Sequence, residues 1–284
     1  MKLASFAVSG TATWGVIDGD SAVDVGSVLR SQYPDLKSAI AGNAWGAVKD
    51  AAGKAPRHAL KSITWLPVVG NPDKILCVGL NYEMHRKETG RPDSEHPTMF
   101  VRFNNSQIGH LADLVRPHVS TQFDYEGELA VVIGKPGRYI KRDKAFEHVA
   151  GYACYNDATI RDWQRHTSQF TPGKNFPATG PFGPWMVTPD ELGELAHRRI
   201  QTRVNDLVVQ DAKLGDMIFD IPTIIEYCSG FTRLEAGDVI ATGTPGGVGF
   251  RREPQLFIKP GDTVHVEIDG VGHLINGVVD EQAL

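Results

Sequence analysis

The sequence contains little cysteine: only Cys77, Cys154 and Cys228 among 284 residues. They are far apart and each lies in an apolar stretch. An odd, unclustered set cannot form a complete disulfide framework, and it lacks the paired spacing of a metal-binding knuckle. We therefore expect three buried free thiols in a reducing compartment.

The chain also lacks an excess of positive charge and a long apolar run. Its formal net charge is −5, so a basic surface for nucleic acid or for an anionic membrane is not expected. No apolar run approaches the roughly 18 residues of a membrane helix. The first 20 residues have no apolar core of the kind that a signal peptide needs. These absences predict a cytoplasmic globular protein whose partner is neither nucleic acid nor a membrane.

Turn signals divide the chain into two parts. Alternating apolar residues around a Ser9-Gly10 turn predict a hairpin at the start, and a helix is expected over residues 39–52. The turn signal Gly70-Asn71-Pro72 predicts a boundary. We therefore predict a small N-terminal α/β domain over residues 1–70 and a larger domain over residues 71–284.

The larger domain is rich in strand patterns and has few helical ones. Helices are expected only around residues 81–89, 158–166 and 221–231. Strands and helices do not alternate regularly, which argues against a doubly wound sheet. The prediction is an α+β fold with a mixed or antiparallel sheet.

Two glutamates open an apolar strand in DYEGELAVVIG, residues 124–134. Side chains alternate along a strand, so Glu126 and Glu128 share one face and repel each other. A hard divalent cation such as Mg²⁺, Mn²⁺ or Ca²⁺ would relieve that repulsion. Asp157 in GYACYNDATIRDWQ, at an expected junction of strand and helix, is the best third ligand. Two simpler interpretations stay open: Asp157 caps the helix, or the glutamates lie on a solvated strand face.

A histidine and a glutamate lie three residues apart in VGLNYEMHRKETG. On a helix His85 and Glu88 share a face, so the carboxylate can orient the imidazole as a general base for water. Two alternatives to the general-base interpretation stay open. His85 is a surface histidine in a charged segment, or the pair belongs to a metal-binding arrangement of the Glu-x-x-His type.

Two loops carry polar groups in unusual surroundings. Lys174 is the only charge in PGKNFPATGPFGPW and is a candidate to face an oxyanion, unless it is an ordinary loop lysine. The segment ATGTPGGVG, residues 241–249, carries the hydroxyls of Thr242 and Thr244, and its N–H groups are candidates to cradle a small anion. It is not a P-loop, because no Gly-Lys-Ser/Thr follows. A tight turn is the simpler interpretation.

Taken together, these motifs resemble those of the fumarylacetoacetate hydrolase family. The resemblance covers about residues 72–280 and is carried, in order along the chain, by KILCVGLNYEMHRKE, DYEGELAVVIG, GYACYNDATIRDWQ, GKNF, GDMIFDIPTIIEYCSGF and GDVIATGTPGGVG. It implies a mixed β-sandwich roll with few helices, which agrees with the α+β prediction, and a homodimer.

The resemblance also implies roles for the candidate residues. Glu126, Glu128 and Asp157 match the carboxylates that hold Mg²⁺ or Mn²⁺, with one ion per subunit. His85 and Glu88 match the dyad that activates water in hydrolytic members.

Four more residues match positions near the substrate in that family. Lys174 matches a lysine beside the metal and the developing oxyanion. Arg161, Gln164 and Thr244 match positions that contact the substrate.

Some basic residues and one segment carry no assigned role. Arg102, His110 and Arg116 are candidates to meet a second carboxylate, although exposed basic side chains are the simpler interpretation. Residues 89–100 are a candidate lid.

The function predicted from these matches is divalent-metal-dependent hydrolysis of a carbon–carbon bond in a 1,3-dioxo acid. Substrates of this type are an acylpyruvate, a fumarylpyruvate or a 2,4-diketo-3-deoxy acid, which belong to the catabolism of aromatic or sugar acids. The alternative keeps the site and changes the reaction. It is decarboxylation or isomerisation of a 2-oxo or 2-hydroxydienoate diacid, or a reaction like that of a ureidoglycolate lyase. A binding protein without activity is disfavoured, because no metal carboxylate and neither dyad residue is missing.

Overall fold

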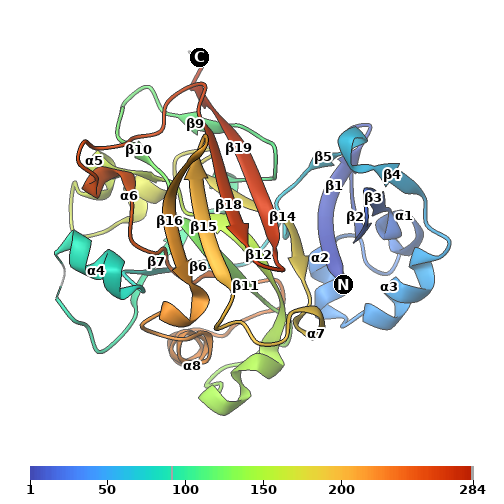
Figure 1. Ribbon diagram of the computed structural model, residues 1–284. Coiled ribbons are helices and arrows are strands. Elements are labelled where there is room, and N and C mark those ends of the chain that lie inside the picture. The colour runs from blue at the N-terminus through green and yellow to red at the C-terminus, as the bar shows by residue number, and fades with distance from the viewer. Residues whose placement is uncertain (91, 283–284) are drawn as a thin grey trace.

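The computed structural model describes residues 1–90 and 92–282, in which two sheets face each other (Figure 1). The larger is a mixed 12-stranded sheet. Its main path runs, in spatial order, through β4 (Arg57–Ala59), β3 (Ser21–Val23), β2 (Thr11–Asp18), β1 (Lys2–Val8), β14 (Gly180–Val187), β12 (Val149–Asn156), β11 (Gly127–Ile133), β17 (Val239–Ala241), β6 (Ile75–Gly79) and β7 (Thr98–Arg102). Two short strands join this path at its side: β5 (Thr64–Trp65) on β1 and β8 (Gln107–Ile108) on β14.

The smaller sheets complete the roll. The 5-stranded sheet has the order β16 (Leu207–Lys213), β15 (Arg199–Val204), β18 (Thr263–Ile268), β19 (Gly272–Asp280) and β9 (Leu114–Arg116). A 2-stranded ribbon pairs β10 (Phe123–Asp124) with β13 (Thr159–Ile160). The helices of the described residues are short: α1 (Val25–Leu29), α2 (Leu36–Ala41), α3 (Trp45–Ala52), α4 (Glu83–Thr89), α5 (Arg161–Gln164), α6 (Thr171–Lys174), α7 (Pro189–Leu192) and α8 (Ile221–Phe231). This arrangement confirms the α+β fold class and the mixed β-sandwich roll with a small N-terminal α/β module.

The N-terminal module lies to one side of the roll and shares its large sheet (Figure 1). Strand β1 pairs with β14 through Lys2 opposite Val187 and Leu3 opposite Met186. The hairpin of β1 and β2 is confirmed. The boundary at residue 70 stays a prediction, because strands from both sides of it belong to one sheet.

Two predicted helices differ from the structure, each for a local reason. The helix expected over 39–52 is broken into α2 and α3, with Asn43 between them at a φ of 46° in the left-handed region. The helix expected from residue 158 begins only at Arg161, because Thr159 and Ile160 pair with β10 instead.

Strand β11 is buried on both faces, which explains its almost continuous apolar sequence. Leu129 and Val131 lie in the core between the two sheets. Ala130 and Val132 lie in the core that includes the N-terminal helices. Because both faces of β11 are packed, Glu128 on this strand and Glu126 just before it are held in the protein interior.

The three cysteines are free and buried, as predicted. Within residues 1–90 and 92–282, no helix has the length and apolar character needed to cross a membrane.

His110 links the two sheets to the N-terminal module and is not the exposed base that the sequence suggested. Its Nδ1 accepts a hydrogen bond of 3.0 Å from the N–H of Ile275, and its ring meets Trp65 edge-on. Burial, with a smaller contribution from His273, lowers the pKa of His110 from 6.5 to about 4. The folded protein therefore favours the neutral imidazole.

This burial predicts a specific loss of stability in acid. A depressed folded-state pKa contributes stability that is present above the ordinary value of 6.5 and is lost as the pH falls toward about 4. The contribution is about 2–3 kcal/mol of unfolding free energy. His110→Asn keeps an acceptor for Ile275 without titrating, so its urea-unfolding free energy should fall less between these pH values. His118→Asn, at an exposed histidine, is the control. The prediction would be contradicted if the unfolding free energy of His110→Asn changed with pH as much as that of the wild type.

Candidate metal and substrate site

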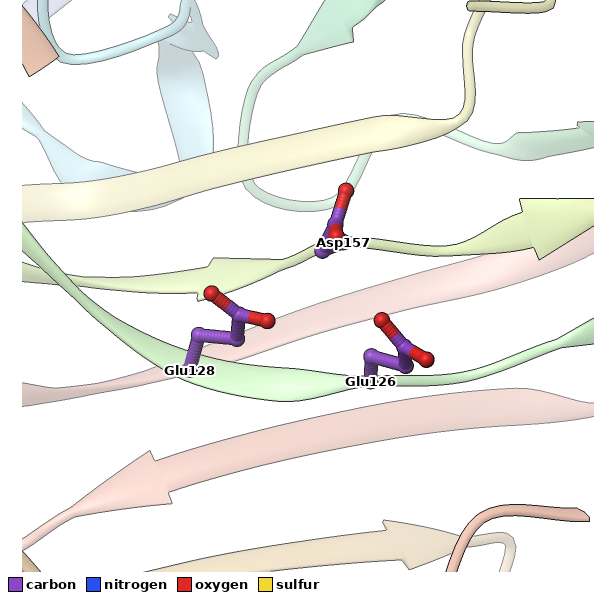
Figure 2. A group of neighbouring side chains, drawn as sticks. All are labelled: Glu126, Glu128 and Asp157. Atoms are coloured by element: carbon purple, nitrogen blue, oxygen red, sulfur yellow. The ribbon is translucent and has the colours of Figure 1, made fainter. Parts of the chain in front are cut away.

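Three carboxylates meet at one end of the β11–β12 pair (Figure 2). Glu126, Glu128 and Asp157 each offer an oxygen, and these oxygens lie within 4.8 Å of one another. Their residues are 4%, 2% and 0% exposed. The structure thus brings together the three residues that the sequence selected as metal ligands, and it places none of them on a solvated face.

The strand register explains this meeting. β11 and β12 are antiparallel with Gly127 opposite Asn156, and the N–H of Asp157 donates to the Glu126 carbonyl at 2.9 Å. Glu126 and Asp157 are therefore neighbours across the pair. Gly127 separates the glutamates because a Cβ there would lie 2.1 Å from Oγ1 of Thr202 in the facing sheet.

Asp157 is held by a buried arginine and does not cap a helix. Arg102 Nη1 lies 2.7 Å from Asp157 Oδ1, and its Nη2 donates to Thr179 Oγ1 at 2.7 Å. Both side chains of the ion pair are fully buried. The expectation that Arg102 is exposed is wrong, and Arg102 positions Asp157.

Glu126 is held in the same way by Arg161 on α5. Arg161 Nη2 lies 2.7 Å from Glu126 Oε1, and Nε donates to Asp124 Oδ2 at 2.8 Å. Its Nη1 donates to Gln164 Oε1 at 3.1 Å. Arg161 and Gln164 both line the cavity described below, but the Arg161 guanidinium is already bound by side chains of the protein.

Lys174 on α6 bridges two of the carboxylates. Its Nζ lies 2.6 Å from Glu126 Oε2 and 2.5 Å from Asp157 Oδ2, and 3.3 Å from the Asp157 carbonyl. The ammonium also lies 4.9 Å from the Phe100 ring centroid. The three hydrogens of this buried ammonium therefore have acceptors within the site.

Glu128 lacks such a partner. Its Oε2 accepts a hydrogen bond of 2.8 Å from the Gly243 N–H, but no cationic side chain lies within 4.0 Å of it in the described residues. Burial, Asp157 and Glu126 raise the pKa of Glu128 well above its usual value. In contrast, Arg161 and Lys174 outweigh the effect of burial on Glu126 and hold its pKa at about 2.

The ionic groups of the site leave one negative charge unbalanced. Four carboxylates face three cations, so their formal sum is −1: Asp124, Glu126, Glu128 and Asp157 against Arg102, Arg161 and Lys174. A buried charge without a partner is costly. A divalent cation would change the sum to +1 and attract an anionic ligand. The donor set contains only oxygens and an unbalanced carboxylate, so it fits a hard divalent cation.

The histidine–glutamate pair lies on α4, beside the same cavity. His85 is buried, and its Nδ1 lies 2.8 Å from Glu88 Oε1. Glu88 Oε2 accepts from the Gly247 N–H at 2.9 Å, which fixes the carboxylate. An ionised Glu88 accepts the Nδ1 proton, so Nε2 is left as the basic nitrogen.

The glycine-rich loop binds carboxylates of the protein itself. The N–H groups of Gly243 and Gly247 donate to Glu128 and Glu88, rather than forming an empty cradle for an anion. Thr244 lines the cavity; its hydroxyl donates to the Gly127 carbonyl at 3.0 Å and accepts from Gln210 at 2.7 Å.

All nine residues selected from the sequence lie at or beside one cavity of about 340 Å³. Its lining combines apolar side chains with charged ones, and among these Arg165 and Arg251 are exposed. The lining residues are Val78, Gly79, Leu80, His85, Thr89, Phe100, Glu126, Glu128, Arg161, Gln164, Arg165, Thr167, Phe170, Lys174, Thr244, Phe250 and Arg251. Of the candidate lid, residues 92–97 precede β7, and residue 91 lies outside the described residues.

A rolled mixed sheet that carries three buried carboxylates and an oriented histidine along one cavity has the features of an enzyme site. The chain belongs to the fumarylacetoacetate hydrolase family: the family model described as fumarylacetoacetate (FAA) hydrolase C-terminal matches residues 74–279.

Curated relatives include tautomerases. The chain is 42% identical over 230 residues to the human mitochondrial oxaloacetate tautomerase FAHD2A. This alignment covers 80% of this chain and 73% of that protein. It is also 42% identical over 226 residues to the Bacillus subtilis oxaloacetate tautomerase YisK, and this alignment covers 78% of this chain and 75% of that protein.

Solved structures include enzymes named as hydrolases. A fumarylacetoacetate hydrolase from Exiguobacterium antarcticum has a TM-score of 0.87 and 36% identity, covering 99% of this chain and all of that one. A maleylpyruvate hydrolase from Sphingobium sp. SYK-6, in complex with manganese(II) and pyruvate, has a TM-score of 0.84 and 29% identity with the same coverage.

Proposed function

We propose that the protein uses Mg²⁺ or Mn²⁺ to interconvert the keto and enol forms of a small 2-oxo acid. This is the isomerase alternative of the sequence prediction. Relatives named as oxaloacetate tautomerases support it, and so does the disposition of the groups in the cavity.

The observation that carries the proposal is the contrast between His85 and Lys174. The Nζ of Lys174 already has Glu126 and Asp157 as partners, so it is not free to stabilise a second oxyanion. His85 is oriented by Glu88 and keeps one nitrogen for proton transfer. A site with one free base and no spare oxyanion donor suits proton transfer better than hydrolysis of a carbon–carbon bond.

Each residue then has a defined part in the reaction. Glu126, Glu128 and Asp157 would hold the divalent cation, which when bound stabilises negative charge on the 2-oxo oxygen of the substrate. The free nitrogen of His85 removes a proton from the carbon beside the 2-oxo group. A proton is then returned to the oxygen, so the substrate is neither oxidised nor cleaved. Glu88 stabilises the imidazolium formed between the two transfers.

Hydrolysis of a 1,3-dioxo acid is the second candidate, and the same His85–Glu88 pair favours it. A buried imidazole that is held by a carboxylate is also suited to activating water. In that reaction the fourth carbon of the substrate gains a hydroxyl from water, and the carbon–carbon bond breaks to give a carboxylic acid and a pyruvate-like product.

One experiment separates the two reactions. Oxaloacetate and an acylpyruvate are each supplied with the full-length protein and Mg²⁺ or Mn²⁺ in D₂O and in ¹⁸O-labelled water, and NMR and mass spectrometry follow the products. We expect keto–enol interconversion with deuterium entering at the third carbon, at least about a hundredfold above the metal-only rate. EDTA should abolish this acceleration. Carbon–carbon cleavage with ¹⁸O in the carboxylate product, without enhanced exchange, would refute the tautomerase proposal in favour of hydrolysis.

The assembly and the location stay predictions. The homodimer and the cytoplasmic site of action rest on the sequence, and the three free thiols agree with a reducing compartment.

A further inference from the structure

A buried glutamine of the smaller sheet reaches across the core to the carboxylate site. Gln210 lies on β16 and is 2% exposed. It pairs in register with Thr202 of β15, whose side chain lies against Gly127 between the two sheets. Gln210 lies outside the lining of the cavity and has no part in the proposed reaction. A buried amide is costly unless its hydrogen bonds are made, so its partners indicate what it does.

The Gln210 amide is fixed by partners that can act in only one way. Its Oε1 accepts from the Gly127 N–H at 2.9 Å, and a backbone N–H can only donate. Its Nε2 donates to the Pro245 carbonyl at 2.8 Å, and a carbonyl can only accept. The second hydrogen of Nε2 goes to Thr244 Oγ1 at 2.7 Å. One side chain therefore ties β11 to the glycine-rich loop, in a single orientation of its amide.

These bonds replace a backbone partner that β11 would otherwise need at Gly127. β17 pairs with β11 through Ala130–Val132, and Gly127 precedes that range. The Gly127 N–H donates to Gln210, and the Gly127 carbonyl accepts from the Thr244 hydroxyl at 3.0 Å. Without the Gln210 amide, a buried backbone N–H would lose its partner and the Thr244 hydroxyl would lose its donor. Gln210 thus controls both polar groups of the Gly127 backbone, one directly and one through Thr244.

The same two groups belong to the peptides from which the metal carboxylates extend. The Gly127 N–H is part of the peptide that follows Glu126, and the Gly127 carbonyl is part of the peptide that precedes Glu128. Asn156 Oδ1 accepts from the Glu126 N–H at 3.0 Å, so the next peptide is held by a side-chain amide as well. A shift of either Gly127 peptide would change the spacing of the carboxylate oxygens, which lie within 4.8 Å of one another.

We infer that Gln210 is a positioning residue for the divalent cation. Through its bonds to Gly127 and Thr244 it fixes the spacing of the two glutamates, without contacting the ion. The inference rests on the cation of the proposed function, and it applies to both candidate reactions. Residues that orient metal ligands typically change metal affinity or activity about tenfold to a hundredfold when they are replaced. The affinity for Mn²⁺ in the absence of substrate therefore reports this role.

Titration of the full-length protein with Mn²⁺ tests the role of Gln210. Gln210→Met keeps the length of the side chain and removes the amide. We expect calorimetry to show Mn²⁺ binding about tenfold to a hundredfold weaker than in the wild type. The electron paramagnetic resonance spectrum of the bound Mn²⁺ should change as well, because it responds to the arrangement of the ligands. Gln210→Asn keeps an amide that is too short to reach both partners, and it should weaken Mn²⁺ binding if Gln210→Met does not fold.

Thr202→Val is the matched control. Thr202 is fully buried in the same layer, and its Oγ1 has no hydrogen-bond partner in the part of the chain that the structure describes. The variant therefore changes a buried polar side chain without touching the bonds of Gln210. It should bind Mn²⁺ with the affinity and the spectrum of the wild type. All titrations are made well below the melting temperatures of the metal-free variants.

The outcomes separate positioning from support of the fold. A lower melting temperature of Gln210→Met with the Mn²⁺ affinity and spectrum of the wild type would overturn the inference. An equal loss of affinity in Thr202→Val would overturn it too, because any disturbance of the layer would then suffice. If the wild type does not bind Mn²⁺, the inference fails together with the metal site. Weaker Mn²⁺ binding in Gln210→Met, in a protein whose wild type lacks keto–enol activity, would support the inference and overturn the proposed function.

Discussion

Replacement of His85 by asparagine is expected to lower kcat at least about a hundredfold while metal binding stays unchanged. His85 is 4% exposed and its Nδ1 is bound to Glu88, so its other nitrogen is the base that the reaction needs. It does not belong to the group of side chains that can hold the cation. Steady-state kinetics and calorimetric titration with Mn²⁺ measure the two quantities separately.

The partner of His85 provides a sharper test of the same role. Glu88→Gln keeps the size of the side chain and an acceptor for the Gly247 N–H, but its amide can donate to Nδ1 of His85. The imidazole would then carry its proton on the reactive nitrogen, and kcat should again fall strongly. His197→Asn, at an exposed histidine, is the control. A rate near that of the wild type in His85→Asn would remove the histidine from the mechanism of both candidate reactions.

The sequence predicts the carboxylate cluster because two of its members are close in the chain. Glu126 and Glu128 are separated by one glycine, and strand alternation alone puts them on one face. Asp157 is different, since it reaches the site through the pairing of β11 with β12. Local pattern does not encode that register. The expected junction of strand and helix selected Asp157 as a candidate, and the family resemblance then matched it to a metal ligand. The buried position of the two glutamates follows from packing on both faces of β11, whereas Asp157 is buried in its ion pair with Arg102.

Arg102 shows what local pattern cannot reveal. It stands in TMFVRF, where a charged residue near the end of a strand is usually exposed. Alternation puts it on the same face as the buried Phe100, which was the available signal. Its partner Asp157 is 55 residues away in the chain, so the ion pair that justifies its burial appears only in three dimensions.

Glu128→Gln is expected to abolish the stabilisation of the protein by Mg²⁺ or Mn²⁺. Without metal, the variant should nevertheless be at least as stable as the wild type. Glu128 carries the unbalanced charge of the site, and its pKa is raised well above the usual 4.5 by burial and by two neighbouring carboxylates. The folded protein holds the proton of Glu128 more tightly than the unfolded chain does. The resulting contribution to the unfolding free energy is fully present below pH 4.5 and is lost as the pH rises through the pKa of the folded state. The amide keeps an acceptor for the Gly243 N–H and removes the charge. Metal-free melting temperatures at neutral pH should therefore be equal or higher in the variant, and the difference should vanish below about pH 4.5.

Glu126→Gln is the matched control, because it should have the opposite effect without metal. Glu126 balances Arg161 and Lys174, and removal of one partner from a buried ion pair typically costs about 3–5 kcal/mol. Its melting temperature should fall by several degrees. Both variants should lose the stabilisation by Mg²⁺ or Mn²⁺, and both should lose activity at least about a hundredfold. Equal destabilisation of the two metal-free variants would show that Glu128 is balanced by the protein itself. The charge argument for a divalent cation would then fail. A higher melting temperature for Glu128→Gln together with a lower one for Glu126→Gln would identify Glu128 as the carboxylate that the cation neutralises.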